Sequence, residues 1–285
     1  MGLARRPGCD IRQPMPFLTA NGIRTYYEVV GGGDPLLLLH NDALSLDVWR
    51  RLIPHLAARH RVIAYDRRGH GQSEIPAREA PYSVEVLVED LRGLLDGLGI
   101  SEADLFGCSG GAVTALAFAL ASPERVRRLI LAEPPILGLR QDHPIDTAGL
   151  QGDTIARIMQ EHGVAAGLDY WFRCVLPPAR ARALLRSRYR TLLLSRPPWI
   201  IEGILRSAEG FNPTPRLQGV RQPVLLVLGE KTHRHFSSII DVLGAHLPRA
   251  TRLTLPGADH STLLEPSDTL LSAVRDFLAT PVPAG

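Results

Sequence analysis

Hydrophobic and polar positions alternate along the chain in a way that predicts strands and helices in turn. Short apolar runs bounded by polar or turn-forming residues have the length expected of strands that are buried on both faces of a parallel sheet. Such runs occupy Leu36–His40, Arg61–Tyr65, Ala103–Phe106, Arg127–Ala132, Pro223–Leu228 and Thr251–Leu255. Strands that alternate with helices favour a parallel sheet covered on both faces.

The segments between these runs have helical spacing, and a hairpin precedes them. Asn21-Gly22 lies inside the alternating segment Phe17–Val30, and Asn-Gly is the strongest short hairpin-turn signal. Ser83 is a suitable N-cap for one of the helices. The helices are predicted at Leu46–Arg59, Ser83–Leu98, Gly110–Ala121, His235–His246 and Pro266–Leu278. The pattern therefore predicts an α/β fold with a mostly parallel eight-stranded sheet and helices on both faces.

Residues 137–218 interrupt this rhythm. They are rich in arginine, proline and aromatic residues, and their periodic parts, Thr154–Tyr170 and Ala179–Leu194, have helical spacing. We interpret 137–218 as a helical cap inserted into a core formed by 16–136 and 219–280, and we expect 1–15 to be a flexible tail. The alternative is a longer helical layer with no role over the site.

Composition and charge narrow the class of protein. The chain has 285 residues, of which 45% are hydrophobic, and a net charge of +3. Its arginines are scattered, which argues against nucleic acid as a partner. No secretion signal and no apolar stretch of the roughly 18–20 residues that span a membrane is present. Three cysteines (Cys9, Cys108 and Cys174) lack metal-ligand spacing, which favours a reduced, cytoplasmic setting without metal or cofactor.

The motif Gly107-Cys108-Ser109-Gly110-Gly111 matches G-x-S-x-G. It follows a predicted buried strand and opens a helix of small residues, which is the strand–turn–helix context of a nucleophile elbow. The turn is so tight that residues two before and two after the serine must lack bulk. We predict Ser109 as a nucleophile, with the backbone N–H of Gly110 as an oxyanion donor.

A serine needs a histidine to take its proton. His260 lies in the loop after the last predicted strand, and in elbow-type hydrolases the histidine comes last in chain order. Three upstream histidines are rivals, but none directly follows a strand end: His233, His235 and His246.

The third member of the triad is less obvious. This acid usually lies three residues after a glycine that ends the penultimate strand. Here Thr232 occupies that position. Thr232 cannot carry the charge that steadies an imidazolium. Glu133, which ends the strand after the elbow, is the favoured substitute, ahead of Glu230. Asp259 adjoins His260, so we expect its side chain to point away.

The loop after the first buried strand, His40-Asn41-Asp42, supplies the second oxyanion donor by its position. Spacing assigns the Asp42 backbone N–H as this donor. The Asp42 carboxylate would be unfavourable beside an oxyanion unless it turns away or meets a hydrogen-bond donor. The predicted cap contains aromatic residues that suit an apolar substrate: Trp171, Phe172, Tyr189, Trp199 and Phe211.

Taken together, Asn21-Gly22-Ile23, Asp66–Ser73, the elbow and Gly257–His260 resemble the α/β-hydrolase superfamily over nearly the whole chain. More narrowly, Gly-Cys-Ser at the elbow, Glu133-x-Pro and the missing acid at 232 resemble the zearalenone lactonases and related bacterial hydrolases. That resemblance implies a Ser109–His260–Glu133 triad. It also implies a substrate contact at Trp199, which follows Pro197-Pro198. Among the cap aromatic residues, Tyr189 and Trp171 are the other predicted substrate contacts. Asn41-Asp42 departs from the Asp-Gly of those lactonases.

These features predict a serine hydrolase that cleaves a small apolar ester, foremost a lactone, through an acyl-enzyme. A carbon–carbon bond hydrolase or another esterase on the same fold is the alternative. A ligand-binding, slow-turnover receptor-like protein is the alternative of another class. We expect no membrane partner, and the oligomeric state stays open between monomer and homodimer.

Overall fold

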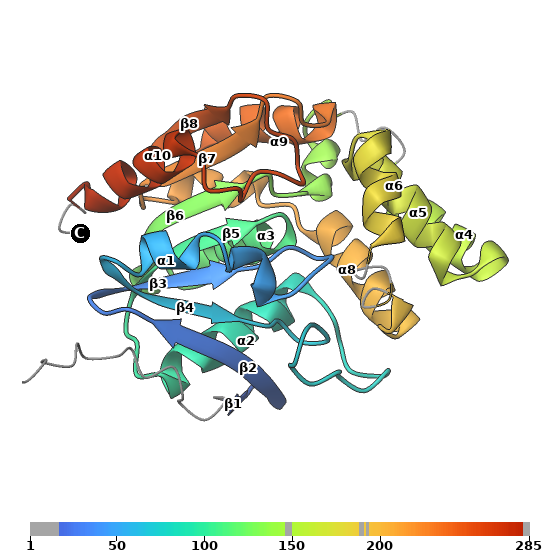
Figure 1. The fold of residues 1–285 in the computed structure, drawn as a ribbon, viewed down its shortest axis with the longest axis horizontal. Helices are drawn as coiled ribbons and strands as arrows, with labels where there is room; N and C mark the ends of the chain where they lie inside the picture. Colours follow the sequence, from blue (N-terminus) through green and yellow to red (C-terminus); the bar gives the residue numbers. More distant parts are fainter. Residues whose placement is uncertain (1–16, 146–149, 188–190, 192–193, 282–285) are drawn as a thin grey trace, which may run out of the picture.

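The alternating pattern forms one eight-stranded sheet in the computed structural model, which describes residues 17–145, 150–187, 191 and 194–281. The strand order is β1-β2-β4-β3-β5-β6-β7-β8 (Figure 1). Strand β2 pairs antiparallel with both β1 and β4, and all other neighbouring strands pair in parallel. The strands are β1 Phe17–Ala20, β2 Ile23–Val30, β3 Asp34–Leu39, β4 His60–Tyr65, β5 Ala103–Cys108, β6 Val126–Ala132, β7 Val224–Gly229 and β8 Ala250–Leu255. The α/β fold predicted from the sequence, with a mostly parallel eight-stranded sheet and helices on both faces, is confirmed.

Each face of the sheet has its own apolar core, because successive strand side chains point to opposite faces. In β3, Leu37 and Leu39 pack on the side of α2, α3 and α9, whereas Leu36 and Leu38 pack on the side of α1 and α10. All four leucines are fully buried, and each such burial contributes about 1.5–3 kcal/mol. The helices are α1 Ile53–Leu56, α2 Val84–Gly97, α3 Gly110–Ala121, α9 Arg234–His246 and α10 Asp268–Ala279.

Two predicted helices are broken in the structure. The segment predicted at Leu46–Arg59 consists of a 3₁₀ turn, Leu46–Trp49, and the short α1, since Pro54 has no N–H to continue a ladder of helical hydrogen bonds. The segment predicted at Thr154–Tyr170 divides at Gly163, whose φ of +87° ends one helix before the next begins.

Among the described residues, four α-helices lie between β6 and β7, beyond the carboxyl ends of the parallel strands (Figure 1). They are α4 Gly152–His162, α5 Val164–Val175, α6 Pro178–Arg186 and α8 Pro198–Gly210, and we call them the cap helices. Ligands of open α/β sheets bind outside the carboxyl ends of the strands. The cap helices therefore cover the edge of the sheet where a site is expected, and a separate cap domain remains our interpretation.

Two of the three cysteines, Cys108 and Cys174, are free and buried, whereas Cys9 lies outside the described residues. Within the described ranges, no helix has both the length and the apolar character needed to cross a bilayer.

Candidate active site

The turn between β5 and α3 holds Ser109 in a strained conformation. Its φ is +53° and its ψ is −126°, a region that non-glycine residues rarely adopt. Two hydrogen bonds fix the turn: the Ser109 N–H donates to the Ala132 carbonyl at 2.8 Å, and the Ser109 carbonyl accepts from the Ala112 N–H at 2.8 Å. Gly110 is the first residue of α3, so its N–H has no acceptor in a preceding helical turn.

Both outer glycines of the motif lie where a side chain would strike backbone. A Cβ on Gly107 would meet Ala112 and the carbonyl of Gly111, and one on Gly111 would meet the carbonyls of Leu39 and His40. The motif therefore allows α3 to pack directly on β3 and β5.

Gly111→Ala is expected to lower the free energy of unfolding by about 1–3 kcal/mol, because backbone atoms at this crossing must move apart. Urea unfolding followed by circular dichroism measures the loss. Gly32→Ala is the matched control: a Cβ there meets nothing within 4 Å, so we expect a change within about 0.5 kcal/mol. Equal stability of the two variants would contradict tight packing at the elbow.

His260 and Glu133 meet at the carboxyl ends of β6 and β8. Glu133 is fully buried, and its Oε2 lies 2.6 Å from His260 Nδ1. Its Oε1 accepts from the Gly229 N–H at 2.8 Å. The φ of Glu133 is +45°, so this residue, like Ser109, is held in the left-handed region. With its Nδ1 engaged by a carboxylate, the imidazole can present Nε2 as a base.

The competing acids lie elsewhere. The Glu230 carboxylate accepts from the Gly257 N–H at 2.7 Å, and the Asp259 carboxylate accepts from the Ser261 N–H at 2.9 Å. Asp259 points away from His260, as expected. The Thr232 hydroxyl is buried, and no partner for it occurs in the part of the chain that the structure describes.

Two of the rival histidines, His233 and His235, contact each other, whereas the third, His246, lies against the Val242 carbonyl. His233 and His235 approach through their Nδ1 atoms at 2.8 Å. Burial, followed by the neighbouring His233 and His260, lowers the pKa of His235 to about 3. His235 is therefore uncharged at neutral pH.

Ser109 and His260 line one cavity of about 380 Å³. Cap helices α5 and α6 supply much of its apolar wall, and the loop after β3 supplies its polar edge. Residues that line it include Asn41, Asp42, Leu44, Ser109, Leu150, Trp171, Phe172, Val175, Leu176, Leu184, Phe236, His260 and Leu264. A mostly apolar hollow with few polar groups is typical of a small-molecule site.

The three aromatic residues predicted to contact substrate have different outcomes. Trp171 lines the cavity with Ser109, whereas Tyr189 lies outside the described residues. Trp199 lines a second cavity, between α8 and the loop that contains Tyr82, and its contact with substrate stays a prediction. Trp199 faces this second cavity because Ile200, Ile201 and Ile204 take the buried face of α8.

Phe236, which the sequence pattern did not single out, packs against the base. Its ring stacks on His260 with centroids 4.2 Å apart and planes at 12°, and it also lines the cavity. The available signal was its place on the apolar face of the helix after β7, a pattern that core residues share.

The Asp42 carboxylate meets a donor. Asp42 Oδ1 lies 2.7 Å from Arg67 Nη2, and both side chains are buried. The carboxylate also lies against Gly110, where an added Cβ would collide with it. Arg67 thus neutralises a negative charge that would otherwise oppose an oxyanion at this place.

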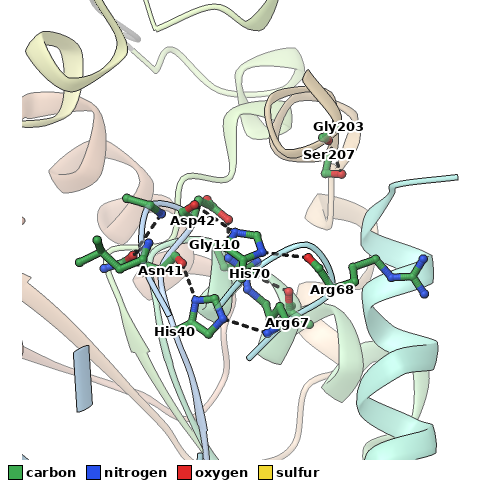
Figure 2. Close-up of polar contacts among 12 residues, drawn as sticks. His40, Asn41, Asp42, Arg67, Arg68, His70, Gly110, Gly203 and Ser207 are labelled. Carbon is green, nitrogen blue, oxygen red and sulfur yellow. Dashed lines mark hydrogen bonds and ion pairs between the residues drawn. The ribbon is translucent and has the colours of Figure 1, made fainter. Parts of the chain in front are cut away.

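His40 ties the same loop to the loop after β4, which carries Arg67 (Figure 2). Its Nε2 accepts from the Arg67 N–H at 2.9 Å, which leaves Nδ1 to donate to the Asn41 carbonyl at 2.7 Å. Burial, and then the Arg67 charge, hold the pKa of His40 well below its usual value, so the imidazole is neutral. The Asn41 carbonyl and the Asp42 N–H belong to one peptide group, which this bond orients.

No group of three or more His, Cys, Asp or Glu side chains in the described ranges could hold a metal ion.

Comparisons with known proteins place these features among hydrolases. A family model described as alpha/beta hydrolase fold matches residues 34–153. The chain is 45% identical over 117 residues to 2-hydroxymuconate semialdehyde hydrolase of Pseudomonas sp. (strain CF600), covering 40% of this chain and 41% of that relative. It is 32% identical over 187 residues to 2-hydroxy-6-oxo-2,4-heptadienoate hydrolase of Pseudomonas putida, covering 57% of this chain and 67% of that relative.

The fold likeness extends further than these sequence matches. The structure of a hydrolase from Pseudomonas aeruginosa PA01 superposes with a TM-score of 0.77 at 26% identity, covering 94% of this chain and 99% of that one. The sequence matches span about two fifths and two thirds of the two curated relatives' own lengths.

Proposed function

We propose that this chain, which belongs to the α/β-hydrolase superfamily, is a serine hydrolase that cleaves carboxylic esters, foremost lactones. The observation that carries the proposal is one arrangement. A strained serine shares a cavity with His260, whose other ring nitrogen lies 2.6 Å from a buried carboxylate.

In the proposed reaction, Ser109 Oγ attacks the carbonyl carbon while His260 Nε2 takes its proton. Glu133 stabilises the imidazolium, and the N–H groups of Gly110 and Asp42 bind the oxyanion. Collapse of the tetrahedral intermediate breaks the bond to the leaving alcohol, which receives the proton from His260. Water then attacks the acyl-enzyme by the same steps and releases the acid.

A lactone suits this cavity because its acyl and alcohol parts stay in one molecule, and the apolar wall from α5 and α6 can bind that molecule throughout. Trp171 and Phe172 line this wall, and their rings stack at 5.6 Å. They present a flat apolar surface to the substrate. The narrower likeness to zearalenone lactonases agrees with this substrate class, and the lactone itself is part of the proposal.

Carbon–carbon bond hydrolysis is the second candidate, and the names of the two curated relatives favour it. The compounds in those names are a semialdehyde and an oxo acid, neither of which contains an ester. Hydrolysis of such a compound breaks the bond between a carbonyl carbon and the carbon next to it. The same serine, base and oxyanion donors would serve both reactions.

A substrate panel distinguishes these candidates. We expect aryl esters and lactones of graded ring size to be hydrolysed. The aryl esters should show a burst of released alcohol, because an acyl-enzyme forms before water attacks it. Mass spectrometry after quenching should find the acyl group on Ser109. Turnover of hydroxy-oxo-dienoates with no turnover of any ester or lactone would contradict ester hydrolysis and support carbon–carbon bond hydrolysis.

A fluorophosphonate probe separates both from a mere binding protein, since only an activated serine reacts with it. Absence of labelling at Ser109 would remove the hydrolase proposal in either form.

A further inference from the structure

Arg196 is a buried cation at the junction between the cap helices and the core. It lies just before α8 and is 9% exposed. Within the described ranges, no carboxylate oxygen lies within 4.0 Å of its guanidinium. Burial lowers the pKa of Arg196 to about 10. Burying an arginine without a paired carboxylate is costly, so this position is one where a specific role offsets the cost.

The guanidinium binds two carbonyls of the loop after β3. Its Nη1 donates to the Asp42 carbonyl at 2.8 Å, and its Nη2 donates to the Leu44 carbonyl at 2.8 Å. This planar fork fixes the direction of both peptide groups. Arg196 itself does not line the cavity, so it touches the loop but not the reacting atoms.

The rest of the loop is held by its own Asn41 side chain and by His70. The Asn41 carboxamide oxygen accepts from the N–H groups of Ala43 and Leu44, and His70 Nε2 lies 3.1 Å from the Asp42 carbonyl. Figure 2 shows His40, His70 and Arg67 gathered around Asn41 and Asp42, with Gly110 beside Asp42. Arg196 is the part of this network that comes from beyond β6, 154 positions along the chain from Asp42.

We propose that Arg196 is a positioning residue that sets the Asp42 end of the oxyanion hole when α8, the cap helix that follows it, is packed on the core. This inference rests on the proposed function, because it concerns the residue whose N–H binds the oxyanion. Displacing Arg196 breaks both hydrogen bonds at once. His70 then remains beside the Asp42 carbonyl, but the fork that ties this carbonyl to that of Leu44 is lost. Transition-state stabilisation would then fall while the apolar wall from α5 and α6 still binds substrate.

The test compares Arg196→Met and Arg196→Lys with a matched control, Arg125→Met. Arg125 also donates to two backbone carbonyls, those of Ser101 and Ile100, but at the opposite ends of β5 and β6. We expect Arg196→Met to lower kcat on a 4-nitrophenyl ester by about 10- to 100-fold with KM within about threefold. Phosphonylation of Ser109 should slow by the same factor, because the phosphoryl oxygen occupies the oxyanion hole.

Arg196→Lys keeps the charge but not the fork, so its kcat should fall between those of the wild type and Arg196→Met. Arg125→Met should reduce Tm and leave kcat and the labelling rate within about twofold. In Arg196→Ala, guanidinium ion below denaturing concentration should restore part of the labelling rate, which keeps the test valid if one variant folds poorly.

The outcomes separate the two claims. A reactive wild type whose Arg196 variants are labelled and turn over at the wild-type rate overturns the role of Arg196 and leaves the proposed hydrolase in place. A wild type that is neither labelled nor active overturns the proposed hydrolase, and the role of Arg196 falls with it.

Discussion

Alanine at position 109 is expected to lower kcat for ester hydrolysis by about 10⁴- to 10⁶-fold. The hydroxyl is the only group removed, and without it no acyl-enzyme can form. His260→Ala should cost a similar factor, because the serine then keeps its proton. Steady-state kinetics with an aryl ester, together with labelling by a fluorophosphonate probe, measures both losses.

The fold should survive the change at 109, since alanine must adopt the same φ of +53° that serine already adopts. Ser122→Ala is the matched control, because Ser122 is a buried serine at the far end of α3. Its kcat should stay within about twofold of the wild type. A loss of less than tenfold in Ser109→Ala, at unchanged Tm, would assign the nucleophile to another residue.

The sheet could be predicted because apolar strands and glycine turns are local signals. Runs such as Leu36–His40 are buried on both faces, and that burial is visible in composition alone. The elbow is local as well, since two glycines and a serine define its sterics. By contrast, the division of the helix predicted at Leu46–Arg59 was missed. Pro54 signals it, but the helical spacing of the apolar residues Trp49, Leu52 and Leu56 masked that signal.

The pairing of Glu133 with His260 followed from chemistry rather than pattern. Thr232 cannot carry charge, so a carboxylate at another strand end was needed, and parallel strands end at one edge of the sheet. The contact between Arg196 and Asp42 had no such guide. It joins residues 154 positions apart through backbone carbonyls, which every residue possesses. Side-chain direction on α8 likewise depends on packing, and for that reason the cavity that Trp199 lines could not be predicted from the sequence.

Glu133→Gln is expected to lower kcat by about 10²- to 10⁴-fold. Glutamine has the same shape and keeps an acceptor for the Gly229 N–H. Its other terminal atom, however, would be an amide nitrogen that cannot accept a hydrogen bond from Nδ1 and cannot stabilise an imidazolium. The loss should appear in kcat and in the rate of Ser109 phosphonylation alike, because both steps need the proton of Ser109 to reach His260.

Glu230→Gln is the matched control for this change, as the same substitution on the other candidate acid. Glu230 is exposed, and its carboxylate accepts from the Gly257 N–H, a bond that a glutamine carbonyl can still make. Its kcat should therefore stay within about threefold of the wild type. The opposite ranking would mean that the loop carrying Gly257 and His260 rearranges when substrate binds, and that the acid acts from the end of β7. Because Glu133 is fully buried beside the imidazole, loss of its charge leaves the imidazolium without a counter-ion, and Glu133→Gln is therefore the more damaging of the two changes.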